Sequence, residues 1–171
     1  MIAYVHAFVL PAAFALLPRE LDTLPARAML LAIGLQESKF FDRYQLLESG
    51  RRGPARGFWQ FELGGGVVDV LTRPTTKRHI ASVLDALRYA PAASACYEAI
   101  EHNDILAACF ARLNLLTHPS RNPRRDEPDL GWRIYAQTWR PGKPHPDTWP
   151  GYFARAWEIV EPAGPSAEIT S

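Results

Sequence analysis

The sequence predicts a mostly α-helical protein: a single domain of about seven or eight helices with little or no β structure. Apolar residues recur at helical spacing through most of the 171-residue chain. No segment alternates apolar and polar residues convincingly enough to indicate a strand. The 15 prolines are typical of short helices joined by rigid corners. The length suits one domain with its own core, which we place at residues 1–160, followed by a loose tail at 161–171.

The composition narrows the possible functions. With 47% apolar and 22% charged residues, the chain is globular rather than disordered. A formal net charge of +1 provides no general attraction to nucleic acid, so no nucleic-acid partner is expected. The five histidines are scattered without metal-ligand spacing, and the glycines at 64–66 lack the Lys-Ser/Thr of a phosphate-binding loop. No metal or other cofactor is expected.

Two cysteines, Cys96 and Cys109, are too few for a disulfide framework and lie in apolar helical contexts, so both are predicted to be buried free thiols. No feature indicates oligomerisation, and a monomer is expected.

The chain begins with an apolar stretch at residues 1–17. We interpret it as a buried first helix over residues 3–16, with a kink or break at Pro11. It is too short to span a bilayer and lacks the basic start of a secretory signal, so no stable membrane insertion is expected. An uncleaved export segment is the alternative.

The second predicted helix runs from Thr23 to about Ser38. Thr23 is a suitable N-cap and Pro25 suits the first turn. Gly34, on the face that leads to Glu37, would let another segment approach closely. The charged, glycine-containing connection at 42–56 is long enough to indicate a functional loop. Any β structure is expected to be short and near residues 57–61, which could be extended or begin a helix.

Further helices are predicted at residues 76–89, 93–100, 105–116 and 130–139, and from residue 146 onward. The helix at 105–116, capped by Asp104, is apolar on almost every side. Such a helix belongs in the middle of a domain.

The candidate catalytic residue is Glu37. A carboxyl group at the end of an apolar helix can be held partly out of water. Desolvation disfavours the charged form and raises the pKa of the carboxyl. A general acid that works near neutral pH needs such a pKa.

Two motifs around Glu37 resemble the lysozyme-like lytic transglycosylases of the SLT type and their phage relatives. Glu37-Ser38 followed by Phe40 is similar to the family's first motif. Gly53-Pro54-Ala55-Arg56-Gly57-Phe58-Trp59-Gln60 is similar to its Gly-Ala-x-Gly-Leu-Met-Gln loop. The resemblance covers about the first third of the chain.

The resemblance implies a lysozyme-like fold and cleavage of the β-1,4 bond between N-acetylmuramic acid and N-acetylglucosamine in peptidoglycan. Glu37 would be the single general acid and base, with the substrate's N-acetyl carbonyl as internal nucleophile. Attack by the sugar 6-hydroxyl would give a 1,6-anhydro product, and attack by water a hydrolysed one; both remain open. A second carboxylate, from Glu62, Glu48 or Asp42, could also take part.

The remaining candidate residues would bind the glycan. Ser38 would orient Glu37 or contact substrate, or else cap the helix. Gln60 offers both a donor and an acceptor to an N-acetyl group, and Gly57 would allow tight backbone passage beside the cleft. The full set of substrate-binding candidates is Ser38, Gly57, Phe58, Trp59, Gln60, Glu62, Asn114 and Tyr135. For Phe58, Trp59 and the Tyr135 region, core packing is the competing interpretation.

The family's third motif, Ala-Tyr-Asn-Ala-Gly, is altered here. The nearest stretch is residues 107–114, where neither Tyr nor Asn is in the expected place and no Gly follows. Arg112 or Asn114 could serve a polar role in the cleft or form a structural hydrogen bond. This departure favours an alternative: a non-catalytic virion, assembly or glycan-binding protein of the same fold. In either case the resemblance implies a phage or prophage product that acts on the bacterial cell wall in the periplasm, or from the virion.

Overall fold

The computed structural model of the protein describes residues 1–162; most of the predicted tail, residues 163–171, lies outside the described residues. The described part is mostly helical, with eight continuous helical stretches and one small two-stranded sheet. The elements, in chain order, are α1 (Ile2–Tyr4), a π-helical turn (Val5–Val9), α2 (Leu10–Phe14), α3 (Leu24–Glu37), β1 (Tyr44–Leu46), β2 (Arg52–Arg56), a second π-helical turn (Leu63–Val67), α4 (Val68–Thr72), α5 (Lys77–Leu87), α6 (Ala93–His102), α7 (Asp104–Leu116), α8 (Pro128–Trp139) and α9 (Trp149–Val160).

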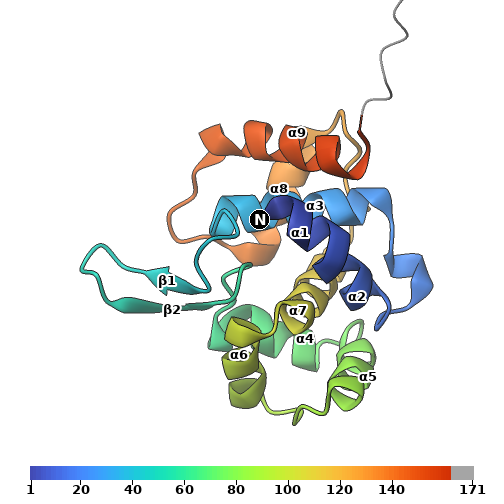
Figure 1. The fold of residues 1–171 in the computed structure, drawn as a ribbon, viewed down its shortest axis with the longest axis vertical. Coiled ribbons are helices and arrows are strands. Elements are labelled where there is room, and N and C mark those ends of the chain that lie inside the picture. The colour runs from blue at the N-terminus through green and yellow to red at the C-terminus, as the bar shows by residue number, and fades with distance from the viewer. Residues whose placement is uncertain (163–171) are drawn as a thin grey trace, which may run out of the picture.

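Helix α7 forms the centre of the fold. Figure 1 shows α3, α8 and α9 in the upper half of the molecule and α4, α5 and α6 in the lower half, with α7 between them. The side chains from Leu106 to Leu115 are all buried, as predicted for an almost wholly apolar helix. The predicted cap is wrong by one residue. The side chain of Asn103, not of Asp104, accepts the Leu106 N–H at 3.0 Å and so caps the helix.

The first helix is continuous rather than broken at Pro11. A π-helical turn at Val5–Val9 lies immediately before the proline, and the backbone stays helical through Leu10. A proline has no N–H to donate, and the wider turn accommodates that loss without a break. One side of this helix is buried, as expected, whereas Tyr4 and Phe8 on the other side are 50% and 67% exposed. No helix among residues 1–162 is long and apolar enough to cross a membrane.

Helix α3 begins and ends as predicted. The Thr23 hydroxyl accepts the Ala26 N–H at 3.3 Å, and the helix ends at Glu37. The Phe40 ring packs so tightly on Gly34 that a Cβ added there would lie 2.1 Å from a ring carbon. The predicted close approach at Gly34 is therefore confirmed. It lets the chain turn back sharply after Glu37, through positive φ angles at Lys39 and Phe40.

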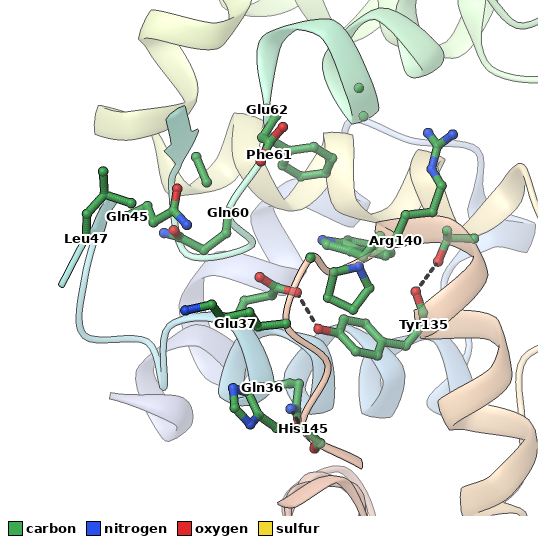
Figure 2. Close-up of a pocket in the computed structure, with 18 of the residues that line it drawn as sticks. Gln36, Glu37, Gln45, Leu47, Gln60, Phe61, Glu62, Tyr135, Arg140 and His145 are labelled. Atoms are coloured by element: carbon green, nitrogen blue, oxygen red, sulfur yellow. Dashed lines mark hydrogen bonds between the residues drawn. The ribbon is translucent and has the colours of Figure 1, made fainter. Parts of the chain in front are cut away.

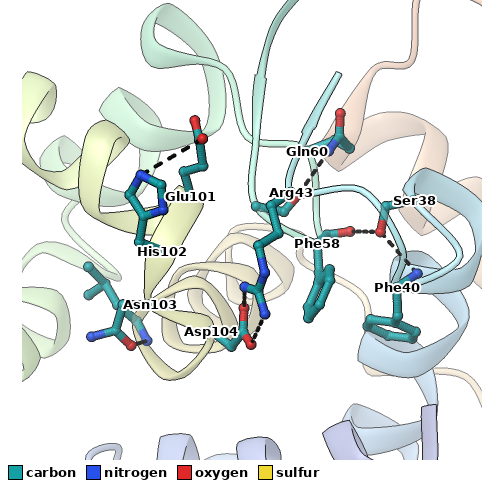
Figure 3. Close-up of polar contacts among 11 residues, drawn as sticks. Ser38, Phe40, Arg43, Phe58, Gln60, Glu101, His102, Asn103 and Asp104 are labelled. Atoms are coloured by element: carbon teal, nitrogen blue, oxygen red, sulfur yellow. Dashed lines mark hydrogen bonds and ion pairs between the residues drawn. The ribbon is translucent and has the colours of Figure 1, made fainter. Parts of the chain in front are cut away.

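The long connection at 42–56 contains an antiparallel hairpin of β1 and β2, immediately before Gly57. The hairpin projects from the helical body (Figure 1) and few of its residues are buried. It is held mainly by charge. Arg52 and Arg56 both pair with the buried carboxylate of Glu101 on α6, the latter at 2.9 Å. At the base of the hairpin, Arg43 pairs with Asp104 (Figure 3).

Cys96 and Cys109 are buried free thiols, as predicted. The Cys109 thiol lies close to the Ala13 carbonyl, with a sulfur–oxygen distance of 3.5 Å. Burial raises its pKa to about 12, so this thiol stays protonated and unreactive.

Candidate functional site

A cleft of about 920 Å³ separates the hairpin from helix α8 and the loop that follows it. The hairpin and the segment from Gln60 to Gly66 form one wall, and α8 with residues 139–145 forms the other (Figure 2). The end of α3 lies between them. A cleft of this size can hold several units of a polymer or a drug-sized molecule.

Glu37 lies in this cleft, half-buried on the last turn of α3. Its Oε1 accepts a hydrogen bond from the hydroxyl of Tyr135 on α8, at 2.6 Å. The pKa of Glu37 is raised to about 7: burial raises it most, the Tyr135 hydrogen bond lowers it, and the negative charge of Glu62 adds a smaller increase. A carboxyl group with this pKa can donate a proton at neutral pH and accept it back.

The three other candidate carboxylates are placed differently. Glu62 lies on the wall of the cleft, exposed, and acts on Glu37 through its charge. Glu48 also lines the cleft, but its carboxylate pairs with Lys143 at 2.9 Å. Asp42 is exposed and does not line the cleft. Glu62 therefore remains the carboxylate with a direct influence on Glu37.

Gln60 is held in a defined orientation. The segment from Gly57 to Gln60 is a tight turn, neither extended nor helical, with positive φ at both ends and closed by backbone hydrogen bonds between Arg56 and Phe61. The Gln60 Nε2 donates to the Gly57 carbonyl at 2.9 Å (Figure 3). Because the amide nitrogen is used inside the turn, Oε1 is the atom of this side chain that can accept a hydrogen bond in the cleft.

Four of the predicted substrate-binding residues do not line the cleft: Ser38, Gly57, Phe58 and Trp59. The prediction that they contact substrate directly is therefore wrong. Phe58 and Trp59 are 1% and 0% exposed. The buried Ser38 hydroxyl donates to the Phe58 carbonyl at 2.7 Å and accepts the Phe40 N–H at 3.1 Å (Figure 3). These hydrogen bonds and buried side chains hold the end of α3 against the loop that carries Gln60.

Gly57 is the fourth of these residues. It does allow tight passage, but beside α6: a Cβ there would lie 2.8 Å from the Ile100 carbonyl oxygen. All four residues therefore have structural roles: Phe58 and Trp59 fill the space under the turn instead of facing the cleft, Ser38 forms hydrogen bonds and Gly57 allows a close approach.

Asn114 and Tyr135 do line the cleft. Asn114 Nδ2 lies 3.4 Å from the Thr138 carbonyl, which it donates to. Arg112 points away from the cleft: its Nε donates to the Leu21 carbonyl at 2.9 Å, and burial lowers its pKa to about 10. The cleft role considered for Arg112 is thus wrong.

The aromatic residues near Tyr135 divide between packing and cleft. Trp149 is buried and stacks on the Tyr135 ring, with centroids 5.3 Å apart and planes 10° from parallel. Trp139 lines the cleft and donates its indole N–H to the Trp59 carbonyl at 2.8 Å. The packing around Trp149 fixes the ring of Tyr135 and so aims its hydroxyl at Glu37 (Figure 2).

Sequence reasoning missed Gln45, Leu47, Arg140 and His145, which also line the cleft. None belongs to a local motif. Each reaches the cleft because the hairpin or the loop after α8 brings it there, and neither arrangement leaves a periodic signal in the sequence.

Among residues 1–162, no three His, Cys, Asp or Glu side chains gather where they could hold a metal ion. Comparison of the chain with models of known protein families, with curated proteins and with solved structures finds no match.

Proposed function

We propose that this protein is a glycosidase that cleaves peptidoglycan at the β-1,4 bond between N-acetylmuramic acid and N-acetylglucosamine, on a lysozyme-like domain. The observation that carries the proposal is a single one. Glu37 combines a pKa of about 7 with a position in a cleft of about 920 Å³. Acid–base cleavage of a glycosidic bond needs a carboxyl group in that state and in that kind of place.

In the proposed reaction, protonated Glu37 donates its proton to the glycosidic oxygen as the bond breaks. The acetamido carbonyl of the substrate attacks the anomeric carbon and stabilises the positive charge that develops there. Ionised Glu37 then removes a proton from the acceptor, either the sugar's own 6-hydroxyl or a water molecule. The acceptor oxygen bonds to the anomeric carbon as the bond from that carbon to the acetamido oxygen breaks, which restores the acetamido group and protonated Glu37. Tyr135 keeps the carboxylate oriented through both steps by its hydrogen bond of 2.6 Å.

The arrangement of the carboxylates supports a mechanism with one catalytic acid. Retaining and inverting glycosidases place a second carboxylate opposite the acid, as nucleophile or base. Here Glu48 is paired with Lys143 and Asp42 lies outside the cleft. Glu62 remains available to hold a water molecule, and its negative charge contributes to the raised pKa of Glu37.

The test is cleavage of purified peptidoglycan by the whole chain and by Glu37→Gln, which keeps the size of the side chain and its ability to accept from Tyr135. We expect the wild type to release soluble fragments and the variant to lose at least about a thousandfold in rate, while circular dichroism shows an unchanged fold. Mass spectrometry of the fragments distinguishes an anhydro end from a reducing end, which differ by one water. Full activity of the variant would refute the role of Glu37.

The second candidate is a non-catalytic glycan-binding or assembly protein of a phage particle, with the same fold. The altered third motif favours it, since residues 107–114 lack the tyrosine and glycine of the resembled family. Binding to cell walls without release of fragments, by a folded wild-type chain, would support this function. In both cases we place the protein at the bacterial cell wall, as a phage or prophage product.

A further inference from the structure

We propose that Gln45, on β1, determines the specificity of the cleft by reading the acetamido group of a sugar together with Gln60. This inference rests on the proposed function of the cleft and adds a residue that the sequence motifs do not contain. Gln45 and Gln60 extend into the cleft from the same wall (Figure 2).

The orientation of the Gln45 amide is set by the hairpin. Its Oε1 is fully buried and has no hydrogen-bond partner. The side chain lies over Gly53 on β2, where an added Cβ would come within 2.3 Å of Oε1 and 2.7 Å of the amide carbon. The glycine thus creates the space in which the amide rests with its oxygen inward, and Nε2 is the group that remains for the cleft.

A buried acceptor without a partner is costly, at about 1–3 kcal/mol. Such groups are rare in folded proteins, and one that lines a cleft is consistent with a role in function that offsets the loss of stability. Gln45 is one of only two residues within 1–162 with a buried, unpartnered polar side-chain atom; the other, Trp157, lies on α9 and does not line the cleft.

The two amides present complementary groups. Gln60 has its nitrogen tied to the Gly57 carbonyl, so it offers an acceptor. Gln45 has its oxygen buried, so it offers a donor. A secondary amide needs both: its C=O would accept from Gln45 Nε2 and its N–H would donate to Gln60 Oε1. An ammonium group, which has only donors, cannot accept from Gln45.

The charges near the cleft make this preference testable. Glu62 is an exposed carboxylate on the same wall and attracts cations. A sugar whose acetamido group has been converted to an ammonium group would therefore gain an electrostatic attraction while it loses hydrogen bonds. A preference for the acetylated sugar thus reports on the amide pair rather than on electrostatics.

The experiment compares binding of two trisaccharides, β-1,4-linked N-acetylglucosamine and its fully de-N-acetylated form, by isothermal calorimetry at pH 6. The full-length chain carries Glu37→Gln to prevent turnover. We expect the acetylated trisaccharide to bind more tightly. Gln45→Leu should weaken its binding roughly tenfold, the value of one or two hydrogen bonds, without weakening the deacetylated form. Gln45→Glu should reverse the preference, because a carboxylate accepts from an ammonium group.

The matched control is Gln137→Leu, the same change at an exposed glutamine that contacts His118 outside the cleft. It should leave both affinities unchanged. An unchanged preference in Gln45→Leu, with the fold intact, would overturn the assignment of Gln45, as would the absence of any preference in the parent. Cleavage of peptidoglycan by the wild type is measured separately. If Gln45 proves to have no effect on binding, the proposed reaction is therefore unaffected. If the protein prefers the acetylated sugar but cleaves no peptidoglycan, only the proposed reaction is refuted.

Discussion

The Tyr135 hydroxyl donates to Glu37 Oε1 at 2.6 Å, from a helix about a hundred residues away in the chain. This hydrogen bond and the burial of Glu37 act in opposite directions on the pKa of the carboxyl. The hydrogen bond favours the ionised carboxylate and so lowers the Glu37 pKa, while burial raises that pKa by more, to about 7. Burial and the carboxylate of Glu37 also raise the pKa of Tyr135. The phenol therefore stays protonated and can donate the hydrogen bond.

Removal of the phenol should shift the pH dependence of activity upward. In Tyr135→Phe the ionised form of Glu37 loses its hydrogen bond, so its pKa rises above about 7. The proton donor then survives to higher pH, and the alkaline fall in kcat/KM should move to higher pH while the maximum rate drops, because the carboxyl is less well oriented. A pH profile of fragment release measures both. An alkaline limb that moves downward or stays in place contradicts this role of Tyr135.

Removal of the charge at Glu62 should have the opposite effect on the same profile. Glu62 raises the Glu37 pKa by charge repulsion, so Glu62→Gln should lower that pKa and move the alkaline fall to lower pH. Glu158→Gln, an exposed change on α9 outside the cleft, is the control and should leave the profile unchanged. Loss of all activity in Glu62→Gln would instead indicate that Glu62 takes part in the chemistry.

The raised pKa of Glu37 should also be visible as a stability cost. The folded chain binds this proton with a pKa of about 7, above the ordinary glutamate value of 4.5, so folding is favoured by protonation. The contribution is fully present below pH 4.5 and is lost as the pH rises to about 7. Glu37→Gln mimics the protonated form. It should match the wild type near pH 4 and be more stable at pH 8, on the order of 2 kcal/mol after allowance for partial exposure.

Chemical denaturation of both proteins at the two pH values measures this difference. The dependence of the free energy of unfolding on denaturant concentration should be the same for both proteins. Equal stability of the two proteins at pH 8 would show that Glu37 is better hydrated than its surroundings indicate, and would weaken its candidacy as a general acid.

The contact between Gly34 and Phe40 should resist the smallest substitution. Gly34→Ala would place a methyl group 2.1 Å from the Phe40 ring, and we expect a loss of about 2–3 kcal/mol in the free energy of unfolding. Gly151 is the matched control, because it is also helical, in α9, and an added Cβ there meets nothing within 4 Å. Gly151→Ala should stabilise the protein by about 0.5–1 kcal/mol. Thermal unfolding compares the two, and equal effects would contradict the packing seen at Gly34.

The local signals in the sequence predicted most of the helices, but not α4 and the π-helical turn before it, at residues 63–72. Thr23, the apolar face of α3 and the fully apolar α7 each specify their structure through contacts within a few residues, so their positions could be inferred from spacing alone. The cap of α7 was misplaced by one residue because Asn103 and Asp104 are both good cap residues, and the choice fell to a long-range ion pair between Asp104 and Arg43.

The hairpin at 44–56 was not predicted as such. Its strands are short and polar, and what holds them to the body is a set of ion pairs with Glu101 on a helix that comes much later in the chain. Charge pairs between distant segments leave no periodic pattern, and Gln45, which depends on the hairpin, was missed for the same reason.

By itself the sequence determined the helical class and the central helix, because both depend on composition and spacing along the chain. The choice of Glu37 came from the motifs that resemble those of the lytic transglycosylases. Only the tertiary structure decided the surroundings of that carboxyl. It turned Phe58 and Trp59 inward, sent Arg112 away from the cleft and brought Tyr135 to Glu37. The physical reason is that solvent exclusion and hydrogen bonding depend on which segments fold against one another, and those two factors set the pKa on which the proposed chemistry depends.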